Sequence, residues 1–96
     1  MKPSVILNQR RELIHEVTKR FHTVNPRIFG SVLHGDDKDG SDLDLLVDAL
    51  SGTTLFDHGG LQDELESLLG VPVDLRTPGD LPLKFRAQVL VEAKPI

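Results

Sequence analysis

Apolar residues recur along the chain with two different periods, and each period predicts a type of element. From Ser4 to about Phe21 the apolar positions fall three or four residues apart, which is typical of an amphipathic helix. Ser4 suits the N-cap of this helix. A second helix is indicated by a leucine face that ends at Gly70, a residue type that often closes helices. The leucines that we expect in the core are Leu61, Leu65, Leu68 and Leu69.

Short stretches rich in Leu, Val and Ile predict strands between the helices. They cover residues 27–29, 42–48 and 71–75. Pro72 has no N–H group, so it should lie at a strand start or on a sheet edge. A last helix is expected over 84–93, ending before Pro95. The order αβαβαβα indicates an α/β fold in which helices flank a small mixed sheet.

Length and composition narrow the class of protein. The 96 residues fit one domain spanning residues 1–96, and 39% apolar with 27% charged residues is typical of a globular chain. The absence of cysteine excludes disulfides, thiolate zinc sites and a cysteine nucleophile. No apolar run approaches the ~20 residues that span a bilayer, and no secretory signal opens the chain. We therefore expect a cytoplasmic protein without a membrane partner.

The charge pattern disfavours stable binding to nucleic acid. The net charge is −4, with 11 basic residues scattered among 15 acidic ones. Phosphate backbones are bound by clustered Lys and Arg, and single strands by aromatic platforms. Four Phe are the only aromatic residues. Nucleic acid is therefore a poor candidate for the partner of this chain.

Two carboxylates lie two positions apart on a predicted strand. Because side chains alternate between the faces of a strand, Asp42 and Asp44 should point the same way. Such a pair repels unless a cation lies between its members, and hard oxygen ligands suit Mg²⁺ or Mn²⁺. Asp74, on the next strand, would join them in the right register. Three carboxylates can hold two metals about 3.5–4 Å apart.

A second motif precedes the acidic pair. Gly30 and Ser31 leave a predicted strand and enter a tight turn. A glycine there lets the backbone approach a phosphate, to which the following N–H groups and the serine hydroxyl can donate. The pattern is Gly-Ser, ten residues, then Asp-x-Asp.

These motifs resemble the signature of the DNA polymerase β-like nucleotidyltransferase superfamily. They run from Phe29-Gly30-Ser31 through Gly35 to the strand at 41–47, and the segment 71–75 resembles its third-carboxylate strand. The short length and the tail at 85–96 resemble the minimal nucleotidyltransferase antitoxins that are paired with HEPN-domain toxins.

The resemblance implies a role for each motif residue. Asp42 and Asp44 would bind two Mg²⁺ ions, and Asp74 would complete the site and help to activate the acceptor. Gly30 and Ser31 would hold the β and γ phosphates of ATP. AMP would pass to a tyrosine of the HEPN-type toxin and silence it. His34 stands where many relatives have Arg or Lys, and it is the remaining candidate for nucleotide binding.

Other interpretations of these residues stay open. The acidic pair could be the solvent face of an edge strand, and Arg76 could meet phosphate or pair with an acidic neighbour. A calcium loop is excluded because neither Gly35 nor Leu46 supplies a side-chain oxygen at its end positions. The acids at 36–39 are expected in a solvated loop. The other histidines, which we expect at the surface, are His15, His22 and His58.

Two other functions remain possible on the same fold. The chain could be a catalytically idle antitoxin that neutralises its partner by stoichiometric binding. It could also be a free-standing transferase acting on a small molecule such as an aminoglycoside, although no second domain is left to grip one.

Overall fold

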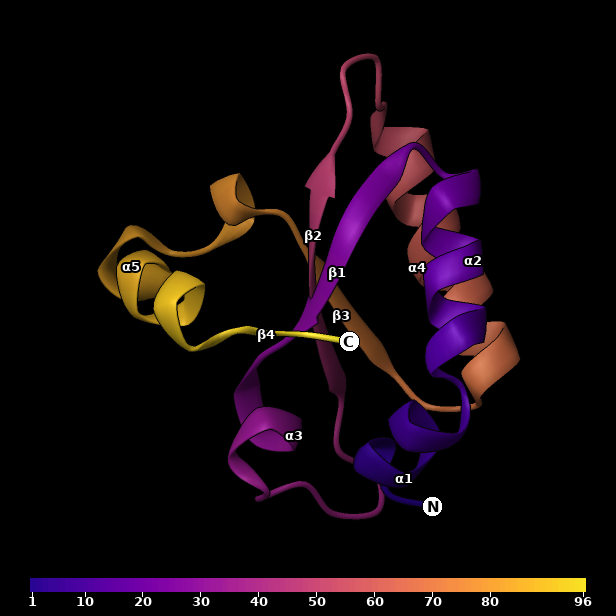
Figure 1. Cartoon of the computed structure of the whole chain (residues 1–96), viewed down its shortest axis with the longest axis vertical. Coiled ribbons are helices and arrows are strands. Elements are labelled where there is room, and N and C mark those ends of the chain that lie inside the picture. The colour runs from indigo at the N-terminus through magenta and orange to yellow at the C-terminus, as the bar shows by residue number, and fades with distance from the viewer.

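The computed structural model describes residues 1–96 and shows a mixed four-stranded sheet with helices around it (Figure 1). The strands are β1 (Thr23–Ile28), β2 (Leu43–Ala49), β3 (Val73–Arg76) and β4 (Lys94–Pro95). The helices are α1 (Pro3–Gln9), α2 (Arg11–Arg20), α3 (Gly30–His34), α4 (Leu55–Leu69) and α5 (Leu83–Glu92), with a 3₁₀ turn η1 (Pro78–Asp80). The predicted α/β class with a small mixed sheet is confirmed.

The strand order in the sheet is β3-β2-β1-β4. β1 runs antiparallel to both β2 and β4, whereas β2 and β3 are parallel. A parallel pair needs a crossover connection, and α4 supplies it. β3 and β4 are the two edge strands, so the acidic strands β2 and β3 lie at one side of the sheet.

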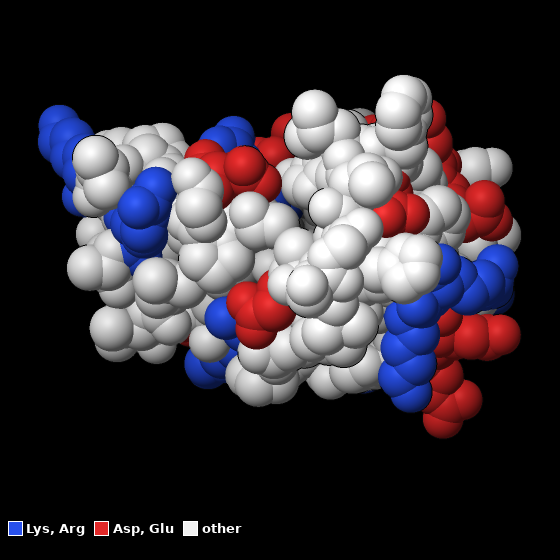
Figure 2. All heavy atoms as spheres, turned by 90° about the horizontal axis from the view of Figure 1, so that it is seen from above, with Lys and Arg blue, Asp and Glu red and all other residues white.

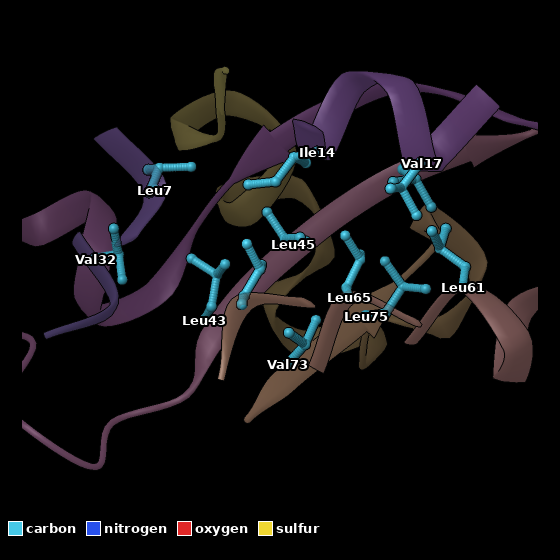
Figure 3. Packing of buried hydrophobic residues seen from close by; sticks show 12 residues of the cluster. Leu7, Ile14, Val17, Val32, Leu43, Leu45, Leu61, Leu65, Val73 and Leu75 are labelled. Carbon is cyan, nitrogen blue, oxygen red and sulfur yellow. The ribbon is translucent and has the colours of Figure 1, made fainter. Parts of the chain in front are cut away.

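The core lies between the sheet and the layer formed by α2 and α4 (Figures 1 and 3). β2 turns Leu43, Leu45 and Val47 into this layer, and all three are fully buried. Alternation then directs Asp44 and Asp48 to the opposite face of the sheet. The helical side is therefore closed by packing, whereas the opposite face of β2 carries Asp44 and Asp48 with the buried Leu46 between them.

α4 begins and ends as its sequence indicates. Thr54 and Asp57 form a reciprocal capping box at its start, and Gly70 closes it in the left-handed conformation with φ 71°. Leu61, Leu65 and Leu69 are buried. The prediction was wrong for Leu68, which is 36% exposed on the flank of the face formed by Leu61, Leu65 and Leu69.

The N-terminal segment is two helices rather than the single helix predicted. Arg10 leaves the helical region, with φ −127° and ψ 25°, and separates α1 from α2. Lys2 is the N-cap of α1, not Ser4 as predicted. The backbone N–H of Ser4 instead donates to Oδ2 of Asp37 at 2.8 Å, which fastens α1 to the loop after α3.

Two prolines, Pro26 and Pro95, lie within strands. β1 begins at Thr23 and carries a register irregularity between Val24 and Arg27, where Asn25 has φ 58°. Such a bulge lets Pro26 stay in the strand, since its missing N–H is not needed in the ladder. Pro95 belongs to β4 and pairs with Arg27.

Candidate active site

The acidic residues of β2 and β3 meet on the sheet face opposite α2 and α4. Parallel pairing places Asp44 directly beside Asp74, since the two residues are Cα partners in the ladder. Adjacent strands lie about 4.8 Å apart, which brings the two carboxylates together. Asp42 lies just before β2 and is exposed to solvent. The structure therefore brings Asp44 and Asp74 side by side, with Asp42 just before the start of β2.

Crowding of negative charge is clearest at Asp44. Burial raises the pKa of its carboxyl to about 6, and the charges of Asp74 and Asp42 act in the same direction. A hydrogen bond from the Ser31 backbone partly opposes this rise. The half-buried carboxylate thus lacks a full countercharge on this face.

The Gly30–Ser31 turn packs against the same carboxylate. Phe29 N–H donates to the carbonyl oxygen of Asp44 at 3.2 Å, which fixes the end of β1 against the start of β2. Gly30 has φ 69°, and a Cβ there would lie 2.9 Å from Cγ of Asp44. Only glycine satisfies both conditions. Ser31 follows at the start of α3 and is half-buried.

Arg76 is the cation nearest to the acidic group. Its Nε lies 3.1 Å from Oδ1 of Asp74, and its Nη2 lies 3.4 Å from Oδ2. The Asp74 carboxylate raises the pKa of Arg76. Nη1 donates to the carbonyl oxygen of Asp80 at 3.3 Å and ties the arginine to η1. Of the two interpretations of Arg76, the structure shows the ion pair with an acidic neighbour.

His34 points toward α5 in this structure. Its Nε2 lies 3.3 Å from Oε2 of Glu92, and its side chain is half-exposed. Beside the pair is a hollow of about 350 Å³, which is lined by Leu33, His34, Val91, Glu92 and Lys94. A contact between His34 and phosphate would require the imidazole to leave Glu92.

The side chains suit a divalent cation in their chemistry. Asp44 and Asp74 are adjacent oxygen donors, and the raised pKa of Asp44 reflects a charge that a cation would offset. No three Asp, Glu or His side chains are gathered closely enough to hold a metal ion, so the predicted cluster of Asp42, Asp44 and Asp74 is not assembled in this structure. Arg76 holds both oxygens of Asp74, so that carboxylate would have to be shared or released on metal binding.

Three polar residues have roles that differ from those expected. Asp37 is buried rather than solvated, since it accepts the hydrogen bond from Ser4, and this bond lowers the pKa of the Asp37 carboxyl. His15 and His58 are half-buried rather than on the surface. Their Nε2 atoms lie 2.7 Å from the carbonyl oxygen of Ile96 and 3.0 Å from that of Leu75. Because these contacts join distant segments, no local sequence signal indicates them.

Charge distribution and helix length are two general features of the structure. Acidic and basic side chains are interspersed on the face seen in Figure 2. None of the helices combines the length and apolarity needed to cross a membrane.

Comparison with known sequences gives the class of protein. The profile of the nucleotidyltransferase domain family matches residues 10–96, so the chain belongs to this family. It is 36% identical over 77 residues to the protein adenylyltransferase MntA of Thermococcus cleftensis, which covers 80% of this chain and 78% of that protein. A candidate protein adenylyltransferase of Methanocaldococcus jannaschii is 31% identical over 87 residues, or 91% of this chain and 94% of the relative.

Solved structures narrow the family to its smallest members. A candidate minimal nucleotidyltransferase superposes with a TM-score of 0.85 and 44% identity, over 97% of this chain and 95% of that chain. A toxin-antitoxin crystal structure with AMP-PNP superposes with a TM-score of 0.73 over 90% of this chain and 70% of that chain. At 23% identity, the second likeness supports the fold alone. The expected resemblance to minimal nucleotidyltransferases is thereby confirmed.

Proposed function

We propose that the chain is the antitoxin of a toxin-antitoxin pair and transfers AMP from ATP to a tyrosine of a HEPN-type toxin in the cytoplasm. Relatives that are 36% and 31% identical carry the name protein adenylyltransferase, and two structural neighbours come from toxin-antitoxin crystals. These names support AMP as the group transferred and a protein as its acceptor. HEPN identity and tyrosine follow from the resemblance of the sequence.

One observation carries the proposal: the Gly30–Ser31 turn is packed against Asp44, which is paired in register with Asp74. A glycine turn offers backbone N–H groups to phosphate oxygens, and carboxylates offer ligands to a cation. Their direct contact supports a triphosphate site and a metal site that one nucleotide can reach together. A stripe of surface acids would not require a glycine at position 30.

Each residue then has a distinct role in phosphoryl transfer. Gly30 and Ser31 bind the β and γ phosphates through the turn. Asp42 and Asp44 would hold two Mg²⁺ ions, which would neutralise charge at the phosphates and lower the pKa of the acceptor hydroxyl. Asp74 orients the acceptor hydroxyl and takes up its proton. Positioning and electrostatics account for most of the catalysis in this class of reaction.

The transfer is tested by mass. The chain is incubated with the toxin, Mg²⁺ and ATP labelled at the α-phosphate, and the intact mass of the toxin is then measured by mass spectrometry. We expect the toxin to gain the mass of AMP. A toxin variant in which the acceptor tyrosine is changed to Phe should show no gain. An unmodified toxin in the presence of folded, ATP-binding chain would contradict the proposal.

A stoichiometric antitoxin is the alternative function, and a double variant separates the two. Asp42→Asn with Asp44→Asn removes the charges that hold the metal while leaving side chains of similar size. If catalysis silences the toxin, this variant should still form the complex but should no longer neutralise it. Full neutralisation by the variant would instead favour simple masking of the toxin.

A further inference from the structure

A hollow of about 270 Å³ lies next to Asp74, outside the turn that we assign to phosphate. Its walls come from the start of α4, from β3 and from η1. The lining residues are Leu55, His58, Asp74, Leu75, Arg76 and Asp80. β3 is an edge strand, so the hollow lies at the side of the sheet where another molecule can approach.

The order of the strands places the hollow opposite the phosphate turn. The turn follows β1 and contacts Asp44 on β2, and Asp74 on β3 comes next. Transfer of a nucleotide proceeds in line, so the attacking oxygen and the leaving pyrophosphate lie on opposite sides of the phosphorus. If the triphosphate tail occupies the turn on the β1 side, the acceptor hydroxyl has to arrive from the β3 side.

The lining of the hollow suits an aromatic ring with a hydroxyl group. Leu55 supplies apolar surface at the rim, where it is 91% exposed, whereas the Leu75 side chain is buried in the core. The Arg76 guanidinium is a cation that can lie over a ring face. His58 is held by its contact with the carbonyl oxygen of Leu75 at 3.0 Å, so it forms a fixed wall.

We propose that this hollow receives the acceptor side chain, a phenol-bearing residue of the partner protein, and presents its hydroxyl to Asp74. The assignment rests on the proposed function. The hydroxyl oxygen forms a bond to the α-phosphorus, and the bond between that phosphorus and the bridging oxygen of pyrophosphate breaks. The electron pair leaves with pyrophosphate, and the phenolic proton passes to the Asp74 carboxylate.

Substitution at the rim tests the assignment through substrate affinities. Leu55→Trp should obstruct the hollow and raise the toxin concentration at half-maximal rate by tenfold or more, while the Kd for AMP-PNP stays within twofold. Phe56→Trp is the matched control, because Phe56 is equally exposed at 91% but does not line the hollow. Equal effects of the two variants, or none from Leu55→Trp, would overturn the assignment.

A second measurement does not depend on catalysis. A photo-crosslinking amino acid is placed at position 55 or at position 56 of the full chain, and each is irradiated in complex with the toxin and AMP-PNP. We expect position 55 to link to the toxin segment that carries the acceptor tyrosine, with little product from position 56. Crosslinks from position 55 to other segments, or none, would refute the hollow as the acceptor site. Failure of AMP transfer with this crosslink intact would refute only the proposed reaction.

Discussion

The backbone of Gly30 lies against the carboxylate of Asp44, so closely that a Cβ at position 30 would come within 2.9 Å of Asp44 Cγ. This contact joins the end of β1 to the start of β2 at the point where Phe29 N–H also donates to the carbonyl oxygen of Asp44. The Gly30–Ser31 turn and the start of β2 are therefore held against each other at this point. Displacement of either part should disturb the other.

Gly30→Ala should abolish ATP binding and destabilise the fold. The substitution places a Cβ at φ 69°, which costs about 1–2 kcal/mol, and also pushes the Asp44 carboxylate aside. Chemical unfolding and titration with AMP-PNP measure the two effects. Gly35→Ala is the control, because Gly35 has φ 74° but nothing within 4 Å of its Cβ position. If Gly35→Ala weakens ATP binding as much as Gly30→Ala, the contact with Asp44 is not the cause.

Asp44 should make the metal-free protein less stable as the pH rises. Its folded-state pKa is about 6 against an ordinary value of 3.8, so the folded chain binds this proton more tightly than the unfolded chain. The resulting stabilisation is complete below pH 3.8 and is lost as the pH rises through 6. After allowance for solvent screening of a half-buried group, we expect about 1–2 kcal/mol.

Urea unfolding of wild type and Asp44→Asn between pH 4 and pH 8, in chelator, measures this effect. The variant should be the more stable protein at pH 8. The difference between the proteins is the relevant quantity, because Asp37, Asp57 and Asp80 have lowered pKa values and contribute the opposite slope below pH 3.8. If the free energy of unfolding changes with pH in the same way for wild type and Asp44→Asn, ionisation of Asp44 does not destabilise the fold.

Arg76 should act as a built-in countercharge when no metal is bound. Arg76→Gln removes the cation that holds Asp74, and the adjacent carboxylates then repel without compensation. A partly exposed ion pair contributes about 0.2–1 kcal/mol, which corresponds to a fall in Tm of a few degrees. Mg²⁺ should recover the lost stability, because it supplies the missing positive charge. The rise in Tm with Mg²⁺ should therefore be larger in the variant than in wild type.

Arg27→Gln is the matched control for Arg76→Gln. Arg27 pairs with Asp48 at 2.7 Å on the neighbouring strand pair, away from the acidic group. Its loss should lower the Tm without changing the response to Mg²⁺. An equal Mg²⁺ response in both variants would mean that Arg76 does not substitute for a cation at Asp74.

The strand pattern carried most of the information on the acidic pair. Alternation in β2 sends Leu43 and Leu45 to the core and Asp44 to the other face, and a parallel crossover aligns β3 beside it. The alternation depends on local periodicity and is visible in the sequence, whereas the register of β3 beside β2 is seen only in the structure. The glycine at position 30 was likewise interpretable, because a strand that ends at Gly-Ser indicates a tight turn.

Features that depend on contacts between distant segments could not be predicted. The break at Arg10 accompanies the bond from Ser4 to Asp37, which lies 33 positions away. The pairing of Pro95 with Arg27 makes a strand from residues that look like a helix terminator. In both cases tertiary contacts override the local preference of the residue.

The pairing of His34 with Glu92 leads to the last prediction. The two side chains lie 3.3 Å apart across α3 and α5, so His34 can meet a phosphate only after it leaves Glu92. Glu92→Gln should weaken the pair and tighten AMP-PNP binding about threefold, whereas His34→Ala should weaken binding. The double variant should match His34→Ala, because the effect of Glu92 acts through the imidazole. Calorimetric titration measures all four proteins. If Glu92→Gln still tightens binding in the absence of His34, the effect is a general loss of negative charge, and His34 is not a nucleotide ligand.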